Sequence, residues 1–211
     1  MNYTASKVPA NYAGNRSNKT LFLVENAILI AIILLMAFTP IGYIKIGALS
    51  ISLITIPVAI GAISIGPSSG ALLGFVFGTT SFLQCFMGDT FGMALLSINP
   101  VLTFIVCVPT RTLAGYLSGL CFKVLRRKIK VPAFYIAGFL MAFFNTALFM
   151  SVLVLCFWNA EVIKTWSESL GTFNPLIFII LSIGVNAVVE WIATTVAGGS
   201  VGLALSKIRK N

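Results

Sequence analysis

The sequence has very few charged residues for its length, and it has no histidine. Of 211 residues, 14 are Lys or Arg and 5 are Asp or Glu, so that 9% of the chain is charged while 58% is hydrophobic. A soluble domain carries about 25% charged residues, because its surface must face water. The mean hydropathy of +1.02 therefore indicates an integral membrane protein, and it excludes a large enzyme domain outside the membrane.

The absence of histidine narrows the chemistry further. It excludes a Ser-His or Cys-His nucleophile, a histidine-ligated zinc ion and an imidazole proton relay. The four cysteines form no C-x-x-C pair, and we interpret them as small buried hydrophobic residues. No G-x-x-x-x-G-K-[ST] phosphate loop is present, so we do not expect the chain to hydrolyse ATP. We expect no catalytic residue, no cofactor and no metal site.

What the sequence does contain is long apolar runs separated by polar or Gly/Pro-containing turns. About 20 apolar residues span a bilayer. We therefore predict an all-α integral membrane protein with six transmembrane helices, over residues 21–38, 51–65, 71–86, 100–122, 131–157 and 175–205. The first run is too long for a signal peptide, which predicts an uncleaved helix. The second and third runs are short, which predicts tilt or an irregular end.

The basic residues predict the orientation of these helices. An even number of spans places both termini on one side, and that side carries eleven Lys and Arg: Lys7, Arg16, Lys19, Lys123, Arg126, Arg127, Lys128, Lys130, Lys207, Arg209 and Lys210. The opposite side carries Lys45 and Lys164. Because loops rich in Lys and Arg stay in the cytoplasm, we predict cytoplasmic termini. The net charge of +9 then follows from topology, and we expect no nucleic acid partner.

This orientation divides the chain into three parts. Residues 1–20 form a cytoplasmic N-terminal segment, residues 21–207 the six-helix transmembrane domain, and residues 208–211 a basic C-terminal tail. The outer loops cover residues 40–50, 87–99 and 158–174, and they mix aromatic and polar residues. Such residues are typical of the interfacial aromatic belt, and they would suit a lid over an outward-facing cavity equally well. Both interpretations stay open.

Four polar side chains at membrane depth are the strongest functional signal. Arg111 lies in the fourth run, Asn145 in the fifth, and Asn186 and Glu190 in the sixth, where a spacing of four residues places the last two on one helix face. Polar groups are costly in hydrocarbon, and they mark either a structural pair or a ligand site. An Arg111–Glu190 ion pair would fix the helix register. An arginine among amides would instead suit a small anion, above all a carboxylate.

Three further residues could complete a ligand site. Gln84 and Asn99 lie at the outer ends of spans and could add contacts from above, and Tyr43 lies in the first outer loop. Glu190 could also couple protons in a stand-alone secondary carrier. Such carriers usually contain two inverted repeats, whereas the six runs here are unequal in length and show no convincing repeat.

Small residues recur at helical spacing in two of the runs. The third run has Gly70, Gly74 and Gly78, and the first has Ala27 and Ala31. Small residues four apart let a second backbone approach closely. By default such ridges pack inside the bundle, but the alanines sit among bulky Leu and Ile, and a notch of that kind suits docking of a partner helix.

Together these features resemble the substrate-binding S component of an energy-coupling-factor (ECF) vitamin transporter. The resemblance rests on the six runs, the spaced alanines, and three segments: Thr-Pro-Ile-Gly-Tyr-Ile-Lys-Ile-Gly (39–47), Ile-Pro-Val-Ala-Ile-Gly-Ala-Ile-Ser-Ile-Gly-Pro (56–67) and Val-Pro-Thr-Arg (108–111). It covers about residues 21–207. Among the branches of the family, the chain looks most similar to the pantothenate type, while riboflavin, folate and hydroxymethylpyrimidine types share the architecture.

The resemblance implies a function and a set of partners. An S component binds a small water-soluble vitamin from outside a prokaryotic cell, without chemical change, in the outer half of the cell membrane. It then delivers the vitamin with a transmembrane coupling subunit (the T component) and two cytosolic ATPases. In this chain Ala27 and Ala31 would face the coupling subunit, and Arg111 would anchor an anionic group. Asn145, Asn186 and Glu190 would orient hydroxyl or amide groups of the vitamin.

Overall fold

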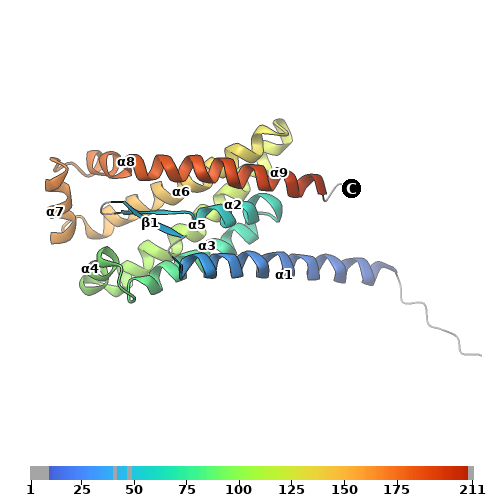
Figure 1. Cartoon of the computed structure of the whole chain (residues 1–211), viewed down its shortest axis with the longest axis horizontal. Coiled ribbons are helices and arrows are strands. Elements are labelled where there is room, and N and C mark those ends of the chain that lie inside the picture. Colours follow the sequence, from blue (N-terminus) through green and yellow to red (C-terminus); the bar gives the residue numbers. More distant parts are fainter. Residues whose placement is uncertain (1–9, 40–41, 47–48, 209–211) are drawn as a thin grey trace, which may run out of the picture.

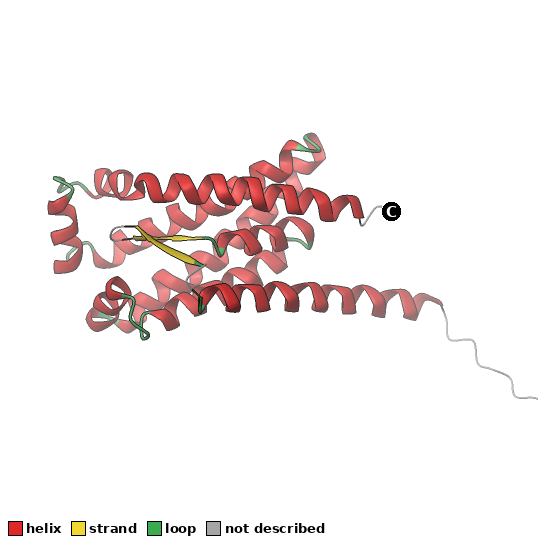
Figure 2. Cartoon of the chain, viewed as in Figure 1, coloured by secondary structure: helices red, strands yellow, loops and turns green. Residues whose placement is uncertain are grey.

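The computed structural model describes residues 10–39, 42–46 and 49–208, with the backbone alone at 10–18, 43–46, 49–51 and 183–186. Within this part of the chain, long helices run side by side in one bundle (Figures 1 and 2). In chain order the elements are α1 (Ala10–Ala37), β1 (Tyr43–Ile46), β2 (Leu49–Ser52), α2 (Thr55–Ser64), α3 (Pro67–Gln84), α4 (Thr90–Ile98), α5 (Pro100–Lys128), α6 (Pro132–Phe157), α7 (Glu161–Ser169), α8 (Pro175–Ala193), the π-helical η1 (Thr194–Gly198) and α9 (Gly199–Ile208).

The two ends of the bundle differ in what they carry. Figure 1 shows α4 and α7 at one end. At the opposite end lie the beginning of α1, the end of α9 and the turn between α5 and α6. The basic residues at the end of α5, Arg126, Arg127 and Lys128, therefore lie on the same side as the two ends of the described chain. This is the arrangement that an even number of crossings requires.

Proline and asparagine fix where several helices begin. The first residue of four long helices is a proline: Pro67 in α3, Pro100 in α5, Pro132 in α6 and Pro175 in α8. Proline suits this position because its φ is already helical and the first N–H has no partner within the helix. Asn99 and Asn174 precede two of these prolines. Their side-chain oxygens accept hydrogen bonds from backbone N–H groups in the first turn of the helix.

Four helical segments of the described chain are long and apolar enough to cross a membrane: Lys19–Ala37, Pro100–Lys128, Pro132–Phe157 and Ala187–Ile208. Large apolar side chains cover the outside of these segments and their neighbours, with Leu155 83% and Ile180 68% exposed. Apolar groups in such number on an outer surface are stable against lipid rather than water. The prediction of a multi-pass helical membrane protein is thus confirmed.

The second and third predicted spans are shorter than the rest. α3 has 18 residues and α2 has 10, which correspond to about 27 Å and 15 Å at the α-helical rise. The hydrocarbon core of a bilayer is about 30 Å thick, so α2 by itself cannot cross it. The first predicted helix is longer than expected, because α1 is already helical at Ala10.

A β-hairpin replaces part of the loop and helix predicted for residues 40–65. Strands β1 and β2 pair antiparallel, with Tyr43 opposite Ser52 and Ile46 opposite Leu49. The prediction of an all-α chain is therefore wrong in this segment. The signal was present in the sequence, because Tyr-Ile-Lys-Ile and Leu-Ser-Ile-Ser alternate apolar and polar residues with the period of a strand. The strands lie in the middle of the bundle in Figure 2.

The glycine ridge of α3 packs inside the bundle, as its default interpretation predicts. A Cβ atom built on Gly74 would lie 2.3 Å from the carbonyl oxygen of Arg111, and one on Gly70 would lie 2.3 Å from that of Gly115. A Cβ on Gly78 would lie 2.7 Å from Cα of Val108. Backbone thus meets backbone along α3 and α5, and no larger residue fits between the two helices.

Candidate ligand-binding site

Arg111 is held at the centre of the bundle by its neighbours on three helices. It lies on α5, is 8% exposed, and is placed against α3 by the close approach of Gly74 to its backbone. Its Cζ lies 4.7 Å from the centre of the Phe77 ring of α3 and 4.9 Å from that of the Phe149 ring of α6. These contacts fix the plane of the guanidinium group through cation–π attraction.

The hydrogen-bonding capacity of Arg111 is largely unused by the described residues. A guanidinium group has five N–H donors. In the described chain, Nη1 donates to the carbonyl oxygen of Cys107 at 3.1 Å, while the buried Nε has no partner. A buried charge of this kind needs a counter-group. The geometry therefore suits an anion that approaches along the edge of the guanidinium plane.

Asn145 and Glu190 form the second part of the site. The amide Nδ2 of Asn145 on α6 donates to Oε1 of Glu190 on α8 at 3.1 Å, and both residues are 6% exposed. The other side-chain atom of Asn145, its Oδ1, is buried without a partner. Asn145 lies one turn before Phe149, so that α6 presents the amide and the ring that contacts Arg111 on one face.

The junction between β2 and α2 closes this polar cluster. Thr55 donates to the carbonyl oxygen of Ser52 at 3.0 Å, and its hydroxyl lies 2.8 Å from that of Thr194 in η1. Thr194 follows Glu190 by four residues and so lies on the same helix face. The Ser52 hydroxyl is buried and has no partner. The cluster thus offers unpaired polar atoms from three elements: Nε of Arg111, Oδ1 of Asn145 and Oγ of Ser52.

Arg111 and Glu190 each have another hydrogen-bond partner in the described chain. Arg111 donates to the Cys107 carbonyl, and Glu190 accepts from the Asn145 amide. The described residues therefore show no hydrogen-bonded Arg111–Glu190 pair, and the choice between a structural pair and a ligand site stays a prediction.

The other predicted site residues lie apart from this cluster or outside the description. Gln84 donates from Nε2 to the carbonyl oxygen of Ala37 and so ties the end of α3 to α1. Asn99 caps α5, where its Oδ1 accepts from the backbone of Val101 and Leu102 at 3.0 and 3.1 Å. The side chains of Tyr43 and Asn186 lie outside the described residues.

Sequence reasoning missed the aromatic and hydroxyl residues of the cluster. Phe77 and Phe149 resemble ordinary core residues, since phenylalanine occurs in five of the six predicted apolar runs. Thr194 did carry a signal, because it follows Glu190 by four residues and so shares its helix face. Ser52 and Thr55 could have been found only through the hairpin, which places them beside α8.

An aromatic cap covers the end of the bundle that carries α4 and α7. Phe91 of α4 meets Trp166 of α7 with ring centres 5.5 Å apart, and Trp166 meets Phe178 of α8 at 4.9 Å. Trp158 contacts the same Phe178 ring at 5.8 Å. We call these four residues the aromatic cap. Because these rings pack against one another, we interpret the aromatic cap as a lid rather than as an aromatic belt that faces lipid.

The alanines of α1 lie on the outer surface. Ala27 and Ala31 are both exposed, whereas Ile33 and Ala37 of the same helix are 0% and 4% exposed in the core. Bulky exposed side chains flank the alanines, with Ile28 56% and Leu35 64% exposed. The small-residue notch of α1 is thus open to a partner, unlike the glycine ridge of α3.

Two comparisons with known proteins give the family. The profile of the family described as "ECF transporter, substrate-specific component" matches residues 21–197. The chain belongs to this family. It is also 30% identical over 201 residues to the pantothenate transporter PanT of Leuconostoc mesenteroides, a match that covers 91% of this chain and 95% of that protein. As a substrate-specific component, the chain is part of a membrane transporter and not an enzyme.

In the described part of the chain, no group of three or more His, Cys, Asp or Glu is placed to hold a metal ion. Charge, hydrogen bonds and aromatic faces are arranged around a buried guanidinium group, and the aromatic cap lies beyond them.

Proposed function

We propose that the chain is the high-affinity substrate-binding subunit of an ECF-type ABC importer, and that its substrate is pantothenate. The observation that carries the proposal is the buried Arg111, whose guanidinium group is oriented by Phe77 and Phe149 and makes one hydrogen bond to the described protein. Pantothenate has a single carboxylate, and a planar guanidinium binds a carboxylate through two parallel hydrogen bonds. The name of the Leuconostoc relative points to the same vitamin.

The rest of the cluster suits the remaining groups of this vitamin. Pantothenate carries an amide and two hydroxyl groups besides its carboxylate. The unpaired oxygens of Asn145 and Ser52 would accept hydrogen bonds from them, and the Glu190 carboxylate would accept a further one. Asn186 lies one helical turn before Glu190 in α8 and belongs to the same proposal. Gln84, Asn99 and Tyr43, at or near the capped end, would contribute only after a rearrangement of the outer segments.

A calorimetric titration of the purified protein with pantothenate tests the role of Arg111. Arg111→Met should weaken binding by about a hundredfold, because hydrogen bonds to a charged group contribute roughly 1.5–3 kcal/mol. Arg111→Lys keeps the charge but loses the planar fork, and it should weaken binding by about tenfold. Lys128→Met, an exposed cation on the same helix, is the matched control and should bind as the unchanged protein does.

The choice of ligand separates pantothenate from the alternatives. Pantothenol, in which a hydroxyl replaces the carboxylate, should bind the unchanged protein about as weakly as pantothenate binds Arg111→Met. Riboflavin, folate and hydroxymethylpyrimidine should not compete. Tight binding of one of these three, with no effect of pantothenate, would keep the family and overturn the substrate.

The proposal includes six crossings with both termini in the cytoplasm of a prokaryotic cell. Four of the six crossings would be the four longer segments. The fifth would be α3, with its 18 residues, and the sixth would be α2 together with the hairpin. In a variant without native cysteines, we expect Glu168→Cys in α7 to react with a membrane-impermeant maleimide added to intact cells. Lys128→Cys at the end of α5 should react only after the cells are permeabilised. Labelling of both positions in intact cells would contradict this topology.

The proposed partners are a transmembrane coupling subunit and two cytosolic ATPases. Support comes from the exposed notch of Ala27 and Ala31 and from the family itself. Proteoliposomes that contain this chain alone should bind pantothenate but should not accumulate it under an imposed proton or sodium gradient. Accumulation driven by such a gradient would instead identify a stand-alone secondary carrier, with Glu190 as the residue to examine.

A further inference from the structure

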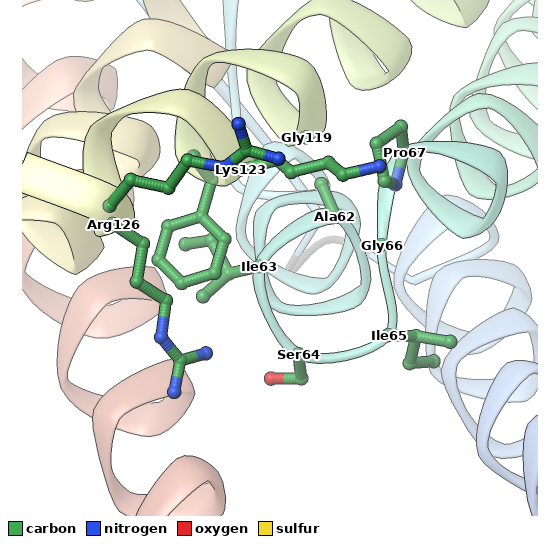
Figure 3. A pocket seen from close by; sticks show the side chains of 11 residues that line it. Ala62, Ile63, Ser64, Ile65, Gly66, Pro67, Gly119, Lys123 and Arg126 are labelled. Atoms are coloured by element: carbon green, nitrogen blue, oxygen red, sulfur yellow. The ribbon is translucent and has the colours of Figure 1, made fainter.

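A second concave site lies far from Arg111, where α2, α3 and α5 end or begin. It is a cavity of about 430 Å³. Its walls come from the end of α2, the Gly66–Pro67 turn and the last turns of α5 (Figure 3). This is the end of the bundle that carries the beginning of α1 and the end of α9 (Figure 1). The vitamin site proposed above does not use it.

Three cations of α5 line this cavity. Arg126 and Arg127 follow Lys123 by three and four residues, so both lie on the helix face that carries Lys123. All three are exposed, and no acidic residue is among the described residues that line the cavity. The cavity therefore holds a concentration of positive charge that the described lining does not neutralise.

The cations are directed to different edges of the cavity. Figure 3 shows Lys123 extending toward Pro67. Arg126 lies on the other side of Ile63 and points away from Pro67. Arg126 is held there by aromatic contacts, because its Cζ lies 5.5 Å from the ring centre of Phe122 and 5.2 Å from that of Phe134. An arginine fixed in this way loses little further freedom when it binds an anion.

Apolar groups and a helix beginning complete the cavity. Ile63, Ile65 and Phe122 supply carbon surface between the cations. Gly66 precedes α3 and has no side chain to cap it, and Figure 3 shows Lys123 extending toward Pro67, the first residue of this 18-residue helix. The N-terminus of a helix favours phosphate through its free N–H groups and its dipole. The cavity thus joins an anion site to an apolar wall.

We propose that this cavity binds the headgroup phosphate of an anionic phospholipid. The phosphate would contact Lys123 and Arg127, and Arg126 would hold a second polar group of the headgroup. The glycerol and first acyl carbons would lie along Ile63, Ile65 and Phe122. Basic pockets between transmembrane helices on the cytoplasmic side are suited to such headgroups. The inference depends on the proposed orientation of the chain, but not on which vitamin it binds.

The mixture of charge and carbon surface favours a lipid over a free phosphate compound. A soluble anion would gain nothing from the apolar wall, whereas a lipid would cover it. The position also fits, because the end of α5 leaves the membrane at the level of the headgroups if the chain spans the bilayer as proposed. Each cation near an anionic membrane surface contributes about 1 kcal/mol, which corresponds to about fivefold in affinity.

Native mass spectrometry of the purified full chain tests the proposal. The protein is exchanged into mixed micelles that contain phosphatidylglycerol and phosphatidylcholine in equal amounts. We expect one phosphatidylglycerol to be retained preferentially. The triple variant Lys123→Gln, Arg126→Gln, Arg127→Gln should lose it, with a decrease in affinity of about a hundredfold.

A matched triple variant keeps the test specific. Lys128→Gln, Lys130→Gln, Lys207→Gln removes three exposed cations that do not line the cavity, and it should retain the lipid. Ser64→Phe fills the cavity without changing charge and should also release the lipid. Vitamin binding by each variant, measured separately, reports folding and is expected to be unchanged.

Three results would overturn the lipid site. Equal loss of lipid from both triple variants would mean that surface charge in general attracts it. Equal retention of phosphatidylcholine and phosphatidylglycerol would mean that the site does not recognise the anionic headgroup. Binding of inorganic phosphate to the cavity with no retained phosphatidylglycerol would identify a site for a free anion instead.

Discussion

Two ridges of small residues, alike in sequence, lie in opposite surroundings in the molecule. Gly70, Gly74 and Gly78 of α3 face α5 so closely that a Cβ on Gly74 would meet the Arg111 backbone at 2.3 Å. Ala27 and Ala31 of α1 have the same spacing and lie exposed on the outside of the bundle. Spacing alone therefore shows that a helix can be approached closely, but not which partner approaches it.

The difference between the ridges has a physical cause in their surroundings. Glycine removes the side chain entirely and allows contact between two backbones, as it does between α3 and α5. Alanine leaves a shallow notch, and the notch of α1 is bordered by exposed Ile28 and Leu35. The glycine ridge of α3 thus sets the position of Arg111, whereas the alanine notch of α1 is exposed and available to a partner helix.

The strongest way to break the internal ridge is Gly74→Val. The new side chain has no space beside the Arg111 backbone, so α3 and α5 must separate and Arg111 must leave its position between Phe77 and Phe149. We expect a loss of about 3 kcal/mol in stability, or no folded protein, from this overpacking. Thermal unfolding in detergent and pantothenate titration measure the two effects.

Ala27→Leu is the matched change on the external ridge. It adds a similar volume to an exposed position of α1, so stability should change by less than about 0.5 kcal/mol. If Ala27→Leu destabilised the isolated chain as much as Gly74→Val, both ridges would belong to the core.

Ala31→Trp tests the external ridge by function. A bulky ring would fill the notch and keep a coupling helix at a distance, so uptake with the complete transporter should fall by about thirtyfold, equivalent to ~2 kcal/mol at a binding hot spot. Pantothenate binding by the isolated chain should be unchanged. Ala204→Trp, at an exposed alanine of α9, is the control. Loss of binding in Ala31→Trp would place the alanines in the bundle core.

Gly78→Ala is the mildest change on the internal ridge. Its Cβ would lie 2.7 Å from Cα of Val108, a contact that the backbones must relieve by a small shift. Alanine favours the helix by about 1 kcal/mol over glycine, which offsets part of the overpacking. We expect a net loss of about 1 kcal/mol in thermal unfolding and unchanged vitamin affinity. An increase in stability would show that the two helices tolerate separation at this level.

The sequence was informative where one physical effect dominates. Long apolar runs predicted the beginnings of α5, α6 and α8 to within one residue, whereas α5 continues to Lys128, six residues beyond the predicted span. The cost of polar groups in hydrocarbon singled out Arg111, Asn145 and Glu190, and the structure brings Asn145 and Glu190 into direct contact while Arg111 lies close enough to interact with Glu190. The role of these residues in binding stays a prediction.

The sequence was less informative where tertiary contacts decide. The alternating pattern of β1 and β2 is short, and it runs directly into the apolar sequence of α2, so the two strands were not separated from the helix that follows them. The partner of Arg111 was not evident either, because phenylalanines such as Phe77 and Phe149 are recognised as site residues only after α3 and α6 are placed against α5. Asn99, predicted as a ligand residue, caps α5 in the structure.

The tryptophans of the aromatic cap provide an intrinsic fluorescence signal for changes at the capped end. The chain has three tryptophans. Trp158 and Trp166 belong to the cap, and Trp191 follows Glu190 directly and packs against Phe139 and Phe143 at 5.6 and 5.7 Å between ring centres. Indole emission is sensitive to contact with water, so opening of the cap or occupation of the site should change the intrinsic fluorescence. Loading and release can then be timed on the unlabelled chain, in a membrane, millisecond by millisecond.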